Sequence, residues 1–196
     1  STETSQLNFP ALGGEAKLAV ACNTKWILSG YPSWTTVSKV QGIGNAEVVF
    51  NAEENPNVSE RSATASLRID GKDESIDISL LQYGKTFGIS PTTLNFTDKG
   101  GSQEVTIETD GSWSATSNSS WTSISPNSSS GNSILTVTAE ENKSDSERNG
   151  TVSITMGDKT LSGSVSQKGT GLTISNNLLT YTSKGGNIAV SITSND

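Results

Sequence analysis

The chain has 196 residues, 31% of them hydrophobic, and a formal net charge of −7. This acidic balance, without a basic patch, excludes nucleic acid and anionic membranes as expected partners. The chain has no histidine, which excludes Ser-His-Asp and Cys-His catalysis and most zinc sites, and no hydrophobic run is long enough to span a bilayer.

An internal repeat organises the sequence. The tryptophan pair Trp26 and Trp34 recurs 87 residues later as Trp113 and Trp121. Short motifs keep the same offset: Leu7-Asn8-Phe9 with Leu94-Asn95-Phe96, Gly13-Gly14 with Gly100-Gly101, Glu53-Glu54-Asn55 with Glu140-Glu141-Asn142, and Arg61 with Arg148. A closing Gln-x-Gly motif recurs as well: Gln82-Tyr83-Gly84 and Gln167-Lys168-Gly169. The repeat therefore predicts two modules over residues 1–84 and 85–169, followed by a linker and the truncated start of a third repeat over 170–196.

Each module is expected to begin with a short strand, a Gly-Gly turn and an alternating strand. In the first module Leu18, Val20 and Cys22 share one face of that second strand. A period of two predicts a sheet with one buried face. Cys22 is the only cysteine, so an internal disulfide is excluded and a buried, unpaired thiol is expected.

Five further alternating segments follow in each module, with no helical periodicity. In the first module they centre on residues 26–28, 35–37, 48–52, 65–69 and 76–80. Glycine-bearing and acidic loops and a turn at 70–72 separate them, whereas residues 85–93 and 170–177 are expected to be linkers. About seven short strands per module predict an all-β fold, with tandem immunoglobulin-like β-sandwich modules.

Strand parity separates the two tryptophans of each pair. Trp26 shares its face with Leu28, so Trp26 and its counterpart Trp113 are expected in the core. Trp34 and Trp121 have the opposite parity from the inward candidates of the following strands, so they should point outward or fold over a sandwich edge. An exposed indole offers an apolar face to a sugar ring. Trp34 and Trp121 are therefore the predicted ligand-binding residues; the alternative is that they cap one end of each core.

The Glu-Glu-Asn loops raise the question of Ca²⁺, which takes carboxylate and amide oxygens. Ca²⁺ needs six or more ligands, and no Asp-x-Asp-x-Asp-Gly spacing is present. A solvated loop that pairs locally with Arg61 or Arg148 is favoured, and no metal or cofactor is expected. Paired carboxylates could support glycoside hydrolysis, but the acidic residues fall mainly in repeated loops or at outward strand positions, so no catalytic residues are predicted.

The order of these motifs resembles the BACON domain family, a Bacteroidetes-associated module suspected of binding carbohydrate and often N-terminal. The motifs are Gly-Gly, the two tryptophans, a glycine loop, Glu-Asn, Arg and Gln-x-Gly, and they cover both modules and the fragment. The resemblance implies an immunoglobulin-like fold and an extracellular or cell-surface location, often in lipoproteins. It supplies no assigned binding residues. Gly163 departs from an inward aliphatic position, and the third copy is cut short at Asp196, so further domains are expected C-terminal to it.

Two functions remain open at this point. The first is a non-catalytic surface module that binds carbohydrate or mucin, or serves cell adhesion; it predicts Trp34 and Trp121 exposed beside polar groups. Two weak sites in tandem would gain from avidity if both could engage. The second is a structural spacer that holds another domain away from the cell surface, and it predicts buried tryptophans and no concave polar site.

Overall fold

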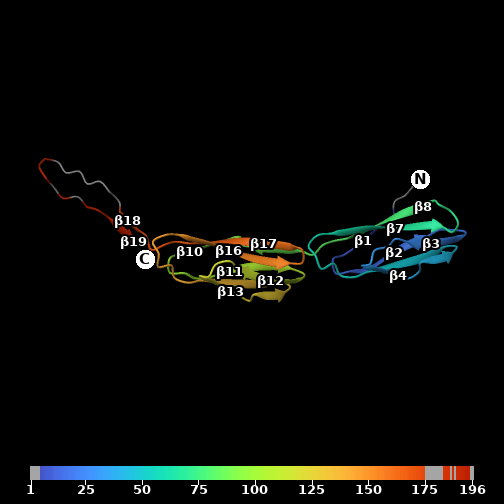
Figure 1. Ribbon diagram of the computed structural model, residues 1–196, viewed down its shortest axis with the longest axis horizontal. Coiled ribbons are helices and arrows are strands. Elements are labelled where there is room, and N and C mark those ends of the chain that lie inside the picture. The colour runs from blue at the N-terminus through green and yellow to red at the C-terminus, as the bar shows by residue number, and fades with distance from the viewer. Residues whose placement is uncertain (1–4, 175–182, 186, 188, 195–196) are drawn as a thin grey trace. The chain divides into compact units, whose positions relative to one another are not determined.

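The computed structural model describes residues 5–174, 183–185, 187 and 189–194 of the chain (Figure 1). The chain divides into two compact units, residues 1–87 with 156–159 and residues 88–155 with 160–196. Every regular element among the described residues is a β-strand. This matches the period-two patterns and the scarcity of long apolar runs in the sequence.

The first unit is a sandwich of two sheets. The larger sheet has the order β1 (Ser5–Phe9), β8 (Ser75–Gln82), β7 (Arg61–Ile69), β3 (Lys25–Ser29), β5 (Gln41–Ile43). The smaller sheet has the order β2 (Gly14–Val20), β6 (Ala46–Ala52), β4 (Thr35–Val37). β1 runs parallel to β8, with Leu7 opposite Leu80, and the other pairs are antiparallel.

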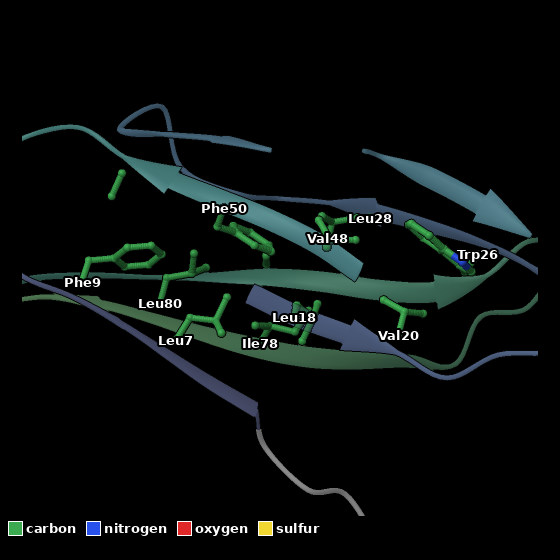
Figure 2. Packing of buried hydrophobic residues seen from close by; sticks show 12 residues of the cluster. Leu7, Phe9, Leu18, Val20, Trp26, Leu28, Val48, Phe50, Ile78 and Leu80 are labelled. Carbon is green, nitrogen blue, oxygen red and sulfur yellow. The ribbon is translucent and has the colours of Figure 1, made fainter. Parts of the chain in front are cut away.

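The alternating residues of both sheets fill the space between them. Figure 2 shows these side chains, with Phe9 near one end of the core and Trp26 near the other. Val48, Phe50, Ile78 and Leu80 are fully buried. Each buried aliphatic side chain of this size contributes about 1.5–3 kcal/mol relative to full exposure, so this core is the main source of the unit's stability.

The second unit repeats the arrangement. One sheet has the order β10 (Thr93–Phe96), β17 (Lys159–Gln167), β16 (Arg148–Met156), β12 (Ser112–Ser117), β14 (Ser128–Ser130). The other has the order β13 (Thr122–Ser125), β15 (Ser133–Ala139), β11 (Gly101–Thr109), β9 (Phe87–Ser90). Trp113, Leu135 and Ile154 occupy the core, as Trp26, Val48 and Leu67 do in the first unit, although Leu67 is only partly buried.

These sheets confirm the predicted all-β, immunoglobulin-like sandwiches and the core positions of Trp26 and Trp113. Four short strands were not expected. β5 and β14 lie in the predicted glycine-bearing loops and pair with β3 and β12. β9 and β18 (Leu172–Ile174) lie in the two predicted linkers and pair with β11 and β19 (Ile192–Ser194). Segments of three or four residues carry too little alternation to be distinguished from a loop, and only their neighbours reveal them.

Two predicted inward residues are not covered. Ile69 and Ile76 are 42% and 51% exposed, because they flank the turn between β7 and β8 at the end of the sheet. Cys22 is half-buried rather than fully buried. In the third repeat β18 (Leu172–Ile174) pairs with β19 (Ile192–Ser194), whereas residues 175–182 lie outside the described part of the chain.

Candidate functional site

Trp34 and Trp121 lie in equivalent turns. Each comes one residue before a strand in the smaller sheet of its unit, β4 for Trp34 and β13 for Trp121. Both are half-buried, so of the two orientations expected from parity, outward or folded over a sandwich edge, neither side chain is fully outward. The Trp34 ring meets the Phe9 ring edge-on, with centroids 6.0 Å apart and an interplanar angle of 85°. Trp34 therefore folds over the end of the core that Phe9 occupies. Figure 2 labels Phe9 at that end.

An arginine covers each of these indoles. The Arg61 Cζ atom lies 4.8 Å from the Trp34 ring centroid, and the Arg148 Cζ atom lies 4.5 Å from that of Trp121. A guanidinium over an indole face is a cation–π contact. One face of each indole is thus occupied by a side chain of the same module.

The arginine is fixed by hydrogen bonds on its other atoms. Arg61 Nε donates to Gln82 Oε1 at 2.7 Å, and its Nη2 donates to the carbonyl oxygens of Glu53 and Glu54, each at 3.2 Å. The acidic loop therefore pairs with arginine through its backbone carbonyls. Burial lowers the pKa of Arg61, and the charge of Glu53 opposes this shift.

A buried glutamine lies at the centre of the network. Gln82 is 0% exposed, and its Nε2 donates to the carbonyl oxygens of Glu53 at 2.7 Å and Pro10 at 3.1 Å. Gln167 repeats the arrangement, with bonds to Glu140, Thr97 and Asp98 carbonyls and from Arg148 Nε. The glutamine joins two loops, after β1 and after β6, to the ends of β7 and β8 at one end of the sandwich. This accounts for the Gln-x-Gly motif that closes each module.

The asparagine of the Glu-Asn motif is also used internally. Asn55 Nδ2 donates to the carbonyl oxygens of Ser59 and Tyr83 at 2.9 and 3.1 Å, and Asn55 Oδ1 accepts from Asn57 N at 3.2 Å. Asn142 makes the equivalent three bonds. The amide oxygen that a cation would take is therefore already bonded, and no cluster of three or more His, Cys, Asp or Glu that could hold a metal is present among the described residues.

The Gly-Gly motif has a steric cause. Gly13 has a φ of 81°, and a Cβ added there would lie 2.5 Å from the carbonyl oxygen of Ala52. Gly100 has a φ of 74° and would meet Ala139 in the same way. Only glycine adopts this conformation so close to another backbone at low cost. Gly-Gly, Glu-Asn, Arg and Gln-x-Gly thus serve one end of the fold, and none of them points to a ligand.

A shallow polar groove lies elsewhere, on the outer face of the three-stranded sheet of the first unit. Its volume is about 430 Å³. Its lining residues come from strands β2, β4 and β6 and from the residue after β4: Glu15, Lys17, Thr36, Val37, Ser38, Val49 and Asn51. Lys17 Nζ lies 3.0 Å from Glu47 Oε1, and this contact raises the pKa of Lys17. Sequence reasoning missed this groove, although the outward parity of Glu15, Lys17 and Asn51 was a usable signal.

No helix in the described part of the chain could cross a membrane. The groove offers charged, amide and hydroxyl groups that can form hydrogen bonds, whereas each arginine guanidinium already bonds within its own module.

Two family models match adjacent parts of the chain. Residues 24–81 match BACON, described as "Putative binding domain, N-terminal", and residues 86–170 match BACON_2, described as "Viral BACON domain". The two matches follow the two sandwiches and confirm the resemblance drawn from the motifs. No curated protein matches the chain.

Some solved structures match parts of the chain at low identity. A Bacteroides ovatus GH5 xyloglucanase in complex with a XXXG heptasaccharide is 24% identical, with a TM-score of 0.40, covering 51% of this chain and 21% of its own. Titin domains z1z2 in complex with telethonin are 11% identical, with a TM-score of 0.40, covering 86% and 92%. The matched part of the chain thus spans about a fifth of the length of the xyloglucanase. These likenesses carry no argument about function.

Proposed function

Because the chain belongs to the BACON family, we propose that it is a non-catalytic binding module that attaches to carbohydrate or mucin at an extracytoplasmic surface. Adhesion, a cell-surface location and a lipid anchor on the whole protein belong to this proposal. The match of residues 86–170 to a viral family model extends it to the surface of a virion. The observation that carries the proposal is the polar groove of the first unit.

The groove has the chemistry that a glycan requires. Exposed Glu15, Lys17 and Asn51 offer charged and amide groups for sugar hydroxyls, and Thr36 and Ser38 add hydroxyl groups. Half-buried Val49 supplies a small apolar surface for C–H groups. Because the groove is open and shallow and has no aromatic platform, we expect weak binding, with a Kd of about 1 mM.

Trp34 and Trp121 remain the second proposed contact. A sugar that stacked on the face of Trp34 covered by Arg61 would have to move a guanidinium that holds hydrogen bonds of 2.7–3.2 Å. This covered state favours the groove over the tryptophans as the place of contact in the first unit.

The test is isothermal titration of mucin O-glycans and plant polysaccharides into the full chain and two variants. Lys17→Ala with Asn51→Ala removes the groove contacts, whereas Trp34→Ala with Trp121→Ala removes the indoles. Loss of heat in the first variant alone supports the groove, and loss in the second alone moves the site to the tryptophans. Circular dichroism of both variants shows whether each is folded.

A structural spacer is the second candidate function. The spacer is favoured because the side chains of the repeated family motifs form hydrogen bonds within each sandwich. In the first unit these side chains are Gln82, Asn55 and Arg61. The absence of heat at millimolar concentrations of every glycan tried would refute the binding proposal for those ligands and favour the spacer.

A further inference from the structure

The outer face of the larger sheet in the first unit carries a second groove. Its volume is about 260 Å³, and the side chains that line it come from β1, β7 and β8: Gln6, Ser62, Thr64, Ser79 and Leu81. The groove of Glu15 and Lys17 described above lies on the outer face of the smaller sheet, so the two grooves are on opposite faces of one sandwich. We call the groove at Leu81 the neutral groove and the groove at Lys17 the charged groove.

The register of three neighbouring strands brings the side chains of the neutral groove together. In the antiparallel pair of β7 and β8, Ser62 lies opposite Leu81 and Thr64 lies opposite Ser79. In the parallel pair of β1 and β8, Gln6 lies beside Ser79. Residues opposite each other in a sheet present their side chains on the same face, about 5 Å apart. Ser79 and Leu81 of the central strand therefore form the floor of the groove, between polar side chains on β1 and β7.

These side chains offer both kinds of contact that a sugar makes. Leu81 is half-buried, so part of its apolar surface is open to the C–H groups of a sugar ring. The hydroxyl groups of Ser62, Thr64 and Ser79 can donate and accept hydrogen bonds, and none of them has a partner in the described part of the chain. The neutral groove thus places free hydroxyl groups around one apolar surface.

In the second unit, the equivalent positions have a different chemistry. Ser166 stands at the position of Leu81, and its hydroxyl donates to Asn95 Oδ1 at 2.7 Å. Ser164, two residues earlier on the same strand, donates to Thr93 Oγ1 at 3.2 Å. The apolar floor is therefore replaced by a serine, and the hydroxyl groups of β17 are already bonded to β10. We expect a sugar to bind at this face in the first unit and not in the second.

Charge separates the neutral groove from the charged groove. Among the described residues, no charged side chain lines the neutral groove, whereas Glu15 and Lys17 line the charged groove. The chain as a whole has a formal net charge of −7. A carboxylate or sulfate group would lose hydration in the neutral groove without gaining a cation, and it would approach an acidic protein. An uncharged sugar carries neither cost.

We propose that the neutral groove is a second carbohydrate site of the first unit and that it takes uncharged sugars. This inference rests on the proposed glycan-binding function and adds to it a second site and a class of ligand. A module with one site on each outer face can hold two glycan chains at once and so cross-link them. Because a single leucine supplies the apolar contact, we expect weak binding, with a Kd of about 1 mM.

Amide chemical shifts of the full chain test the site and the class of ligand together. The neutral probes are xylohexaose and mucin O-glycans from which sialic acid and sulfate have been removed, and the acidic probe is the untreated acidic fraction of the same O-glycans. We expect the neutral probes to shift the amides of Ser79 and Leu81 with an affinity roughly tenfold higher than that of the acidic fraction. Equal affinity of the two O-glycan samples at these amides would overturn the proposed class of ligand.

Two variants test the contacts. Leu81→Ser gives the first unit the residue of the second and should weaken the binding of neutral probes roughly tenfold, because it removes the apolar floor. Thr64→Ala changes an exposed side chain and should weaken binding roughly threefold, with little risk to the fold. Ser66→Ala is the matched control, since Ser66 lies on the same face of β7 outside the groove, and it should leave the affinity unchanged. Unchanged affinity in both groove variants would overturn the proposal.

The place of the shifts separates this inference from the proposed function. Shifts at Lys17 and Asn51 without shifts at Ser79 and Leu81 would refute the neutral groove and leave the charged groove as the glycan site. The absence of shifts at all four residues with every probe would refute both. Shifts at Ser79 and Leu81 with the neutral probes support the inference, whether or not the charged groove responds.

Discussion

The two modules share the polar network around Gln82 and Gln167, but the surroundings of their core tryptophans differ. Trp26 lies opposite Gly42 across the sheet, and its Nε1 donates to the Gly44 carbonyl at 3.0 Å. A Cβ at Gly42 would lie 2.8 Å from Trp26 Cε2. Trp113 lies opposite Ser129, and its buried Nε1 has no hydrogen-bond partner. The indole of Trp26, opposite a residue without a side chain, reaches its acceptor, whereas the indole of Trp113, opposite a serine, does not.

A second difference concerns the loop that follows the first strand. Ala11 of the first module is replaced by Asp98, which is 1% exposed and whose two carboxylate oxygens have no hydrogen-bond partner. Lys99 Nζ lies 3.6 Å from Asp98 Oδ2, at the distance of an ion pair. Burial of a charged group without hydrogen bonds carries a desolvation cost. The second module thus contains two unsatisfied buried groups at positions where the first has none.

The shared network should show the largest effect when it is broken. We expect Gln82→Ala to destabilise the first module by about 3 kcal/mol or more, because buried carbonyls and the Arg61 guanidinium lose their partner. Gln167→Ala should cost the second module a similar amount. Urea unfolding followed by amide resonances of each module measures both. A loss below about 1 kcal/mol in either would contradict a structural role for the network.

Exchanging the residues opposite the tryptophans tests the first difference. Gly42→Ser should cost the first module about 2 kcal/mol, because it displaces the Trp26 ring and breaks its bond to Gly44. Ser129→Gly should change the second module by less than about 1 kcal/mol, since any hydrogen bond gained by Trp113 is offset by glycine entropy. The indole N–H proton resonances report whether each bond forms. Equal costs for the two exchanges would refute the steric explanation.

Replacing the buried carboxylate tests the second difference. Asp98→Ala should stabilise the second module by about 1–2 kcal/mol, because it removes an unsatisfied group from the interior. The reverse change, Ala11→Asp, should destabilise the first module and serves as the matched control. Destabilisation by Asp98→Ala would show that the ion pair with Lys99 outweighs the desolvation cost.

The arginine–tryptophan stacks should contribute less, and equally in both modules. A double-mutant cycle with Trp34→Ala and Arg61→Ala should give a coupling of about 0.5–1 kcal/mol. The same cycle with Trp121→Ala and Arg148→Ala should agree with it. Couplings near zero, measured by urea unfolding, would mean that the stacking contributes nothing to stability.

The smallest effect involves a surface ion pair found only in the first module. Lys25 Nζ lies 2.8 Å from Asp70 Oδ2, and a hydrogen bond from Lys25 lowers the pKa of Asp70. The resulting stability is present above the unfolded pKa of Asp70 and is lost as the pH falls through its folded pKa. Lys25→Ala should raise the pKa of Asp70 toward its ordinary value, as a carboxyl ¹³C titration would show. An unchanged titration would contradict this pairing.

The sequence by itself determined the repeat, the fold class and the core, because the 87-residue offset and the period of two are local patterns in the chain. Trp26 and Trp113 followed from parity alone. Strand β9 could not be predicted, since four residues identify a strand only when a neighbour pairs with them. The prediction that Ile69 and Ile76 are buried was wrong for a similar reason. Parity indicates which face of a strand a residue is on but not where the facing sheet ends.

Only the tertiary structure decided what the repeated polar motifs do. Glu-Asn, Arg and Gln-x-Gly are far apart in the chain, and the fold brings them to one end of each sandwich, where Gln82 and Asn55 bond to backbone carbonyls. Their composition suits a cation site or a glycan site equally well. Whether a polar side chain faces a ligand or a backbone carbonyl depends on long-range geometry. Here the motif side chains bond to carbonyls of their own module, and a guanidinium lies over Trp34 and over Trp121.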